Sequence, residues 1–290
     1  MRRSAWIAFA VVVAVLLALA ANTARQLTGF ALPADSPAER QAQLAGHWRF
    51  AQPHGPGPHP GLVLLSGCDG VRDNMDRWAD AARAMGFATL IVDSHAPRGL
   101  DDFEAWRLVC AGQQLTGAER AGDLAVALAH LRTQPGVDGE RLAVLGVSHG
   151  GWTALDFLTL TDGTDPPPGL TAWPEGSAAA ARGGLRAAIT LYPYCGAGSR
   201  AGARGWEWPG AVTMILVDGD TVTGDAPCRD LAARMADAGT PVALTVLKGV
   251  THGFDQQVRS ALSPLRFDGP ATAQAAAIIG AALTDVAAGR

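Results

Sequence analysis

The chain has 290 residues, of which 48% are hydrophobic and 17% are charged, and its formal net charge is −4. This balance is typical of a single folded domain and excludes a disordered or fibrous chain. Because the net charge is negative and no long run of basic residues occurs, we expect no nucleic-acid partner.

The first segment of the chain has the layout of an export signal. Arg2 and Arg3 precede an apolar run over residues 5–21. A signal peptide has roughly 7 to 15 apolar residues and a spanning helix about 20, so residues 1–24 fit a signal peptide or an N-terminal membrane anchor. With the arginines inside, the rest of the chain is expected to be exported, as a periplasmic or secreted protein or one anchored to the inner membrane.

The next segment, residues 25–60, is rich in proline, glycine and alanine and is expected to be a tether and the entry to a domain over residues 61–290. His54 and His59 lie among prolines without a carboxylate or cysteine nearby, so this pair does not predict a metal site. The sequence likewise calls for no cofactor.

From Gly61 onward, apolar runs of strand length alternate with segments of helical period. This order predicts an α/β fold, a doubly wound and mostly parallel sheet flanked by helices. The expected strands are residues 62–65, 88–92, 142–147, 187–192, 212–217 and 242–247. The expected helices are residues 74–85, 118–133, 149–160, 227–238 and 271–288. Loops at the carboxyl ends of such strands are where ligands bind, so we expect the chemistry there.

The segment GVSHG at residues 146–150 matches the pattern G-x-S-x-G between a predicted strand and a predicted helix. Glycines at these positions permit a sharp turn that exposes a serine hydroxyl at a helix N-terminus, where the helix dipole favours negative charge. Ser148 is therefore the predicted nucleophile. The alternative is that Ser148 only caps the helix.

A serine hydroxyl near neutral pH needs a general base, which in turn needs a carboxylate to orient it. His252 lies in the loop after the last predicted strand and is the predicted base. Asp218 and Asp220 both end the penultimate strand. We choose Asp220 as the orienting acid and keep Asp218 as the second candidate.

Hydrolysis by such a triad passes through an oxyanion, which two backbone N–H groups usually stabilise. The N–H of His149, directly after the nucleophile, is one candidate. The loop after the first domain strand, SGCDG at residues 66–70, supplies the other, and we choose the N–H of Cys68.

Several segments together resemble the dienelactone hydrolase family, from about Leu62 to the end of the chain. They are LLSGCDG, IVDSHAPRG, GVSHGGW, ITLYPYCG, VDGDTVTGDAPC and KGVTHGFD. The resemblance implies the α/β-hydrolase fold and hydrolysis of a small-molecule carboxylic ester or lactone. In that family the acid lies four residues before a frequent proline, a position that corresponds to Asp220 with Gly224 in place of the proline.

The chain also departs from that family. Its nucleophile is Ser148 instead of cysteine, Ser66 stands where many relatives have histidine, and Asp69 stands where many have glycine. Dienelactone itself is therefore not the expected substrate. Family members hold a substrate carboxylate with arginines, and Arg98 lies in about the corresponding loop. Its alternative role is a salt bridge to Asp101 or Asp102.

An exported chain with four cysteines can form two disulfides. In the sheet order of the resembled fold, the strand before Cys68 neighbours the one that leads to Cys110. The strand before Cys195 neighbours the one that leads to Cys228. We therefore expect the pairs Cys68–Cys110 and Cys195–Cys228 beside the active-site loops.

Two other functions stay open. The elbow is followed by an aromatic residue, Trp152, which also resembles serine peptidases of the prolyl-oligopeptidase type, although the sequence has no propeller domain to support that role. The chain is alternatively a catalytically silent binding protein that keeps the fold. The complete set of Ser148, Asp220 and His252 in the order that this fold uses argues against the silent protein.

Overall fold

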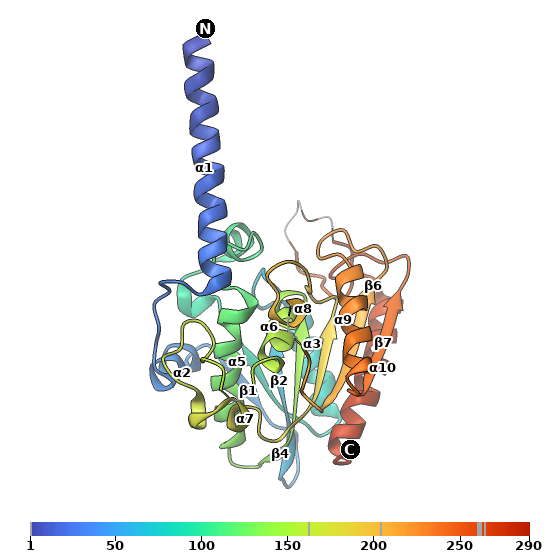
Figure 1. Ribbon diagram of the computed structural model, residues 1–290. Coiled ribbons are helices and arrows are strands. Elements are labelled where there is room, and N and C mark those ends of the chain that lie inside the picture. Colours follow the sequence, from blue (N-terminus) through green and yellow to red (C-terminus); the bar gives the residue numbers. More distant parts are fainter. Residues whose placement is uncertain (1, 162, 204, 260–262, 264) are drawn as a thin grey trace.

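The computed structural model describes residues 2–161, 163–203, 205–259, 263 and 265–290. It contains a seven-stranded sheet in the order β1-β3-β2-β4-β5-β6-β7 (Figure 1). The strands are β1 (Arg49–Ala51), β2 (His59–Leu65), β3 (Ala88–Val92), β4 (Val137–Val147), β5 (Leu185–Leu191), β6 (Ala211–Val217) and β7 (Val242–Leu247). Strand β1 runs antiparallel to β3 and the other pairs are parallel. The predicted, mostly parallel sheet is confirmed.

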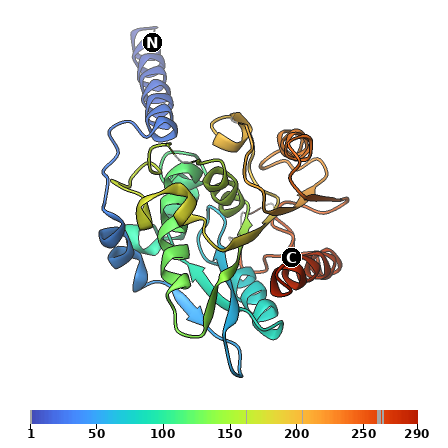
Figure 2. The ribbon, with the colours of Figure 1, turned by 60° about the horizontal axis from the view of Figure 1, so that its bottom comes forward.

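Helices cover both faces of this sheet. The longer helices of the chain are α1 (Arg2–Thr28), which does not pack on the sheet, α2 (Pro37–Ala45), α3 (Asp73–Ala84), α5 (Gly117–Arg132), α6 (His149–Leu158), α9 (Ala226–Asp237) and α10 (Gly269–Ala287). The short ones are η1 (Ala96–Arg98), α4 (Asp102–Glu104), the π-helical turn η2 (Ala105–Val109), η3 (Pro174–Gly176), α7 (Ala178–Ala181) and α8 (Arg200–Ala203). Helices α5, α6 and α9 pack on one face, and α3 and α10 on the other. Figure 2 shows α10 (red) alongside α3 (cyan).

The central strands are apolar on both faces because both faces are covered. In β2, Val63 and Leu65 face the α5 side, whereas Leu62 and Leu64 face the α3 side. All four side chains are completely buried. Burial of one such side chain stabilises the fold by about 1.5–3 kcal/mol, so these strands hold the sheet edge that carries the site in a fixed position.

The segment before the domain is more ordered than a simple tether. Within residues 25–60, α2 places Leu44 in the interior, and β1 pairs with β3. Among the described residues, one helix is long and apolar enough to span a membrane, Arg3–Thr28, with a mean hydropathy of 2.6. Its apolar stretch is not buried against the domain, and Figure 1 shows α1 standing away from it.

Candidate active site

The turn between β4 and α6 has the sharp geometry that its glycines predict. Ser148 has φ 50° and ψ −115°, a strained backbone conformation for a residue with a side chain. A β-carbon on Gly150 would lie 2.2 Å from the Leu65 carbonyl oxygen, and one on Gly146 would lie 2.3 Å from the Gly150 carbonyl oxygen. Both positions therefore require glycine for the chain to bring Ser148 to the edge of the sheet.

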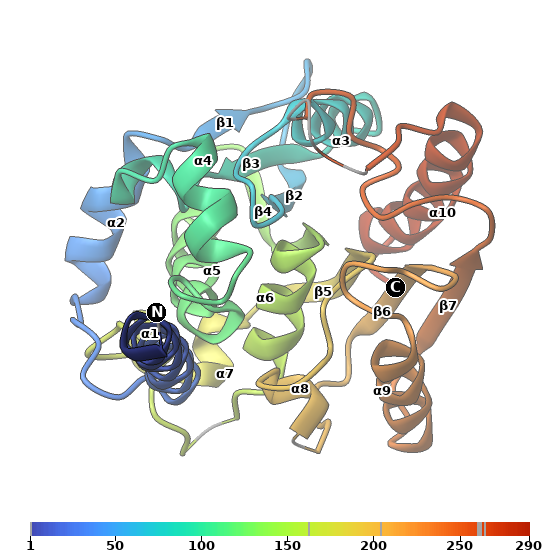
Figure 3. The ribbon, with the colours of Figure 1, turned by 90° about the horizontal axis from the view of Figure 1, so that it is seen from above.

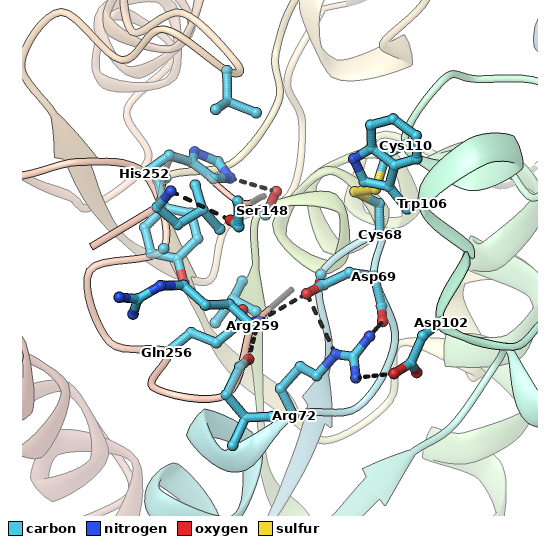
Figure 4. Close-up of a pocket in the computed structure, with 18 residues that line it drawn as sticks. Cys68, Asp69, Arg72, Asp102, Trp106, Cys110, Ser148, His252, Gln256 and Arg259 are labelled. Carbon is cyan, nitrogen blue, oxygen red and sulfur yellow. Dashed lines mark hydrogen bonds and ion pairs between the residues drawn. A yellow bond between two sulfur atoms is a disulfide. The ribbon is translucent and has the colours of Figure 1, made fainter. Parts of the chain in front are cut away.

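Three predicted site residues from distant loops meet at this turn. The Oγ of Ser148 lies 2.9 Å from Nε2 of His252, and Nδ1 of His252 lies 2.7 Å from Oδ2 of Asp220. These distances suit a hydroxyl that donates to Nε2 and an Nδ1–H that donates to the carboxylate. Figure 4 shows the His252 ring directed at Ser148.

The Asp220 carboxylate is held by several donors. Burial raises the pKa of Asp220, but the hydrogen bond and charge of His252 and the N–H groups of Val222 and Thr223 outweigh burial and lower this pKa below its usual value. The carboxylate is therefore ionised at neutral pH. Asp218, the second candidate, is exposed and forms an ion pair with Arg229 at 2.8 Å.

A cavity of about 380 Å³ opens beside Ser148 and His252 (Figure 4). Its lining comes from the loops after β2, β4, β5, β6 and β7 and from the segment between β3 and α5. The apolar part of the lining consists of Trp106, Val147, Val222, Val258 and Leu265, together with Tyr192. Such a lining suits an uncharged organic group near the Ser148 hydroxyl.

One wall of the cavity is charged and internally paired. Arg72 lies 2.9 Å from an Asp102 carboxylate oxygen and 3.5 Å from one of Asp69. Gln256 also donates to Asp69 at 2.8 Å. These pairs tie the loop after β2 to the segment after β3 and to the loop that follows His252.

The two candidate oxyanion donors come from the loop after β2 and from the first residue of α6. Cys68 lines the cavity, and His149 follows Ser148 at the N-terminus of α6. The His149 side chain is buried behind the turn, with Nδ1 3.3 Å from Nη1 of Arg120. Only the backbone of His149 is therefore a candidate for the cavity.

Both expected disulfides are confirmed. Cys68 bonds to Cys110, and Cys195 bonds to Cys228. The first pair lies in the cavity lining, where it joins the loop after β2 to the segment that carries Trp106. The second pair is buried and joins the segment after β5 to the first turn of α9.

Arg98 does not reach the cavity, which corrects its expected role in substrate binding. Its guanidinium lies 2.9 Å and 3.0 Å from the two carboxylate oxygens of Asp123, a completely buried residue of α5. Arg40 from α2 pairs with the same carboxylate at 2.8 Å. The alternative partners, Asp101 and Asp102, instead cap α4 and pair with Arg72.

The sequence analysis missed a buried arginine behind the site. Arg120 donates to the Ser66 carbonyl oxygen at 2.7 Å and to the hydroxyls of Ser66 and Ser94 at 3.0 Å each. Burial lowers the pKa of Arg120 to about 10, so it stays charged at neutral pH. It braces the loop that leads into Cys68. The sequence feature that could have indicated this buried arginine is a basic residue within the apolar helical pattern of residues 118–133.

His95 braces the same loop and makes stability depend on pH. Its Nε2 lies 3.1 Å from the Cys68 carbonyl oxygen, and burial, followed by the charge of Arg120, lowers the His95 pKa from 6.5 to about 3. Below pH 6.5 the unfolded chain binds a proton that the folded chain does not, so stability falls between about pH 6.5 and pH 3. We expect the titration of His95 to lower the free energy of unfolding by about 2 kcal/mol between pH 7.5 and pH 5.0.

Urea unfolding at pH 7.5 and pH 5.0 measures this effect. His95→Gln keeps a donor for the Cys68 carbonyl but does not titrate. Its free energy of unfolding should therefore fall by about 2 kcal/mol less than that of the wild type between pH 7.5 and pH 5.0. His54→Gln, at an exposed position, is the control and should follow the wild type. An equal decrease in the free energy of unfolding on acidification for all three proteins would contradict the role of His95.

One protein-family model matches part of the chain. Residues 48–165 match the model of the dienelactone hydrolase family. No curated protein matches the chain. The matched range includes Ser148 but ends before Asp220 and His252, so the case for these two residues rests on their geometry.

Solved structures show the same fold over most of the chain. Esterase 2 of Thermogutta terrifontis, phosphoramylated by tabun, is 16% identical, with a TM-score of 0.60 over 82% of this chain and 89% of that chain. A structure of this thermophilic esterase with propionate bound is 17% identical, with a TM-score of 0.59 over 82% and 89%. A dienelactone hydrolase-like promiscuous phosphotriesterase from metagenomic libraries is 17% identical, with a TM-score of 0.58 over 82% and 98%. The chain therefore has the α/β-hydrolase fold, and residues 48–165 are similar to the dienelactone hydrolase family.

Proposed function

We propose that the protein is a serine hydrolase that cleaves a carboxylic ester or lactone through an acyl-enzyme on Ser148. The observation that carries the proposal is the pair of hydrogen bonds from Ser148 through His252 to Asp220, at 2.9 Å and 2.7 Å, beside a cavity. A hydroxyl, an imidazole and an ionised carboxylate in this order are the parts that nucleophilic acyl transfer needs.

In the proposed reaction, Oγ of Ser148 attacks the substrate carbonyl carbon while its proton passes to Nε2 of His252. Asp220 stabilises the resulting imidazolium through Nδ1–H. The N–H groups of His149 and Cys68 and the N-terminus of α6 stabilise the oxyanion. Collapse of the tetrahedral intermediate breaks the bond to the leaving alcohol, which takes the proton from His252. Water then repeats the sequence and releases the acid.

The cavity and the comparisons support an ester over other substrates. Its apolar lining fits an acyl chain, and its volume of about 380 Å³ fits a small or medium-sized group. One similar structure is of an esterase with propionate bound, and another is of a promiscuous phosphotriesterase. A peptidase gains no support from Trp152, because this side chain lies inside, donates to Asp156 at 2.8 Å and packs on Tyr194.

We also propose that the domain is exported and that residues 1–24 are its signal peptide or membrane anchor. The exposed apolar helix and the two disulfides support this location, since disulfides persist in oxidising compartments. The assignment of residues 25–60 as the entry to the domain fits the packing of α2 and β1.

The test is rapid-mixing kinetics with p-nitrophenyl esters, combined with fluorophosphonate labelling of the wild-type protein. An acyl-enzyme predicts a burst of p-nitrophenol close to one equivalent when deacylation is the slower step. Peptide mapping should place the fluorophosphonate adduct on Ser148. A protein that neither turns over esters nor accepts the probe would instead be the silent binding protein.

A further inference from the structure

The apolar helix α1 joins the domain without a spacer. Asn22 Nδ2 lies 2.8 Å from the Gln113 carbonyl oxygen, and Gln113 Nε2 lies 2.6 Å from the Thr23 hydroxyl. Leu27, four residues after Thr23, packs closely on Gly198. A β-carbon at Gly198 would lie 2.6 Å from Cδ2 of Leu27. The last turns of α1 are therefore part of the domain surface.

The apolar part of α1 ends where these contacts begin. Residues 5–21 span roughly 25 Å as a helix, close to the hydrocarbon thickness of about 30 Å. Exposed side chains fill this stretch, namely Trp6, Ile7, Phe9, Val11, Val12, Val15, Leu16, Leu17 and Leu19. If a bilayer encloses residues 5–21, its outer surface lies at Asn22 and hence against the domain.

The domain face at this level carries the cavity. Figure 3 looks along α1 onto this face and shows α4 at some distance from α1, with the helical turn that follows α4 running back toward it. Phe103 and Trp106 on this segment are 64% and 65% exposed. The same segment reaches Gln113, whose side chain bonds to α1, so the exposed aromatic pair and the spanning helix are continuous parts of one surface.

This segment is also one wall of the cavity. Asp102, Trp106 and Cys110 belong to the lining, and the lining residues Val222 and Val258 are themselves 54% and 56% exposed. Exposed aromatic and aliphatic groups at a lipid–water boundary are stabilised by partial burial in the bilayer. The cavity lining thus combines exposed apolar side chains with the Arg72–Asp102 ion pair.

We propose that Phe103 and Trp106 rest on the outer surface of the bilayer that α1 spans, so that the cavity takes amphipathic esters from the lipid. The substrate class rests on the proposed ester hydrolysis, whereas the docking does not. Residues 101–107 carry three carboxylates, those of Asp101, Asp102 and Glu104, and one guanidinium, that of Arg107, which lies over the Phe103 ring. The net negative charge disfavours anionic lipid, so the attraction is apolar and should persist on zwitterionic membranes.

The docking is measured first, with the full chain in phosphatidylcholine vesicles that contain bromine-labelled lipid. Trp106→Phe removes one of eight tryptophans, so the difference from the wild type isolates the emission of Trp106. This component should be quenched by the labelled lipid. An unquenched difference, or a mature chain that lacks residues 1–24, would overturn the proposal.

The substrate class is measured with two esters, one soluble and short-chained and one long-chained and dissolved in the bilayer. Phe103 lies outside the cavity lining, so Phe103→Glu should hydrolyse the soluble ester at the wild-type rate. Its rate on the ester dissolved in the bilayer should fall about tenfold. Leu244→Glu, at a 41% exposed position of β7, is the matched control and should retain both rates.

The two proposals fail in different ways. Quenching of Trp106 without turnover of either ester would refute the hydrolase and leave the docking. Soluble turnover with equal bilayer rates for Phe103→Glu and the wild type would refute the lipid-derived substrate and leave the hydrolase. A dimer that Phe103→Glu dissociates would assign the aromatic pair to a second copy of the chain instead of lipid.

Discussion

Replacing Ser148 with alanine is expected to lower kcat for ester hydrolysis by a factor on the order of 10⁵–10⁶ and to abolish fluorophosphonate labelling. The reason is that the Ser148 hydroxyl lies 2.9 Å from His252 Nε2, and the proposed acyl-enzyme cannot form without this hydroxyl. A small residual rate from the oxyanion donors is expected to remain. Steady-state turnover of p-nitrophenyl acetate measures the loss.

The control for this variant is Ser177→Ala, which removes only the hydroxyl that caps α7. It should label and turn over as the wild type does. A Ser148→Ala protein that stays folded by circular dichroism and retains full turnover would show that the nucleophile lies elsewhere.

Asp220→Asn should lower kcat by a factor on the order of 10³–10⁴. The carboxylate accepts from Nδ1–H of His252 at 2.7 Å and thereby leaves Nε2 free to accept from Ser148. An amide NH₂ at this position would donate to Nδ1 and move the imidazole proton to Nε2, where it faces the hydroxyl that it should deprotonate. The loss should appear in kcat across pH 6–9, because Asp220 is ionised throughout that range.

Asp218→Asn is the matched control, since this carboxylate lies two residues away and pairs with Arg229 at the surface. It should change kcat less than about twofold, as exposed ion pairs contribute little. If Asp218→Asn instead produced the large loss, the acid of the site would be Asp218 and the hydrogen bond from His252 to Asp220 would be incidental.

The sheet and the elbow were predictable because their constraints are local. Strands buried on both faces appear as continuous apolar runs, and the turn at Ser148 needs glycines at fixed spacing. β1 was missed because it lies at the sheet edge, where Arg49 and Phe50 remain exposed and leave no apolar run. The first half of β4, residues 137–141, was missed because it is polar and only partly buried.

The partners of the charged residues were not predictable in the same way. Arg98 and Asp123 are 25 residues apart, and their pairing depends on how the loop after β3 lies on α5. The disulfides were predictable because neighbouring strands of a known sheet order bring their following loops together. For a side chain that reaches across a layer, such as Arg120 toward Ser66, the sequence does not indicate the partner.

The packing of the elbow has a consequence for how this enzyme tolerates variation. A β-carbon at Gly150 would overlap the backbone of Leu65 and Ser66 at the end of β2, and one at Gly146 would overlap the backbone of Gly150 and Gly151 in α6. These backbone atoms cannot rotate away. Ser148 itself faces the cavity, so a residue of similar size there leaves the fold intact and changes only the chemistry. In a library of single substitutions, variants at Gly146 and Gly150 should therefore be absent from the folded proteins. Variants at Ser148 should fold and stay soluble but should be inactive.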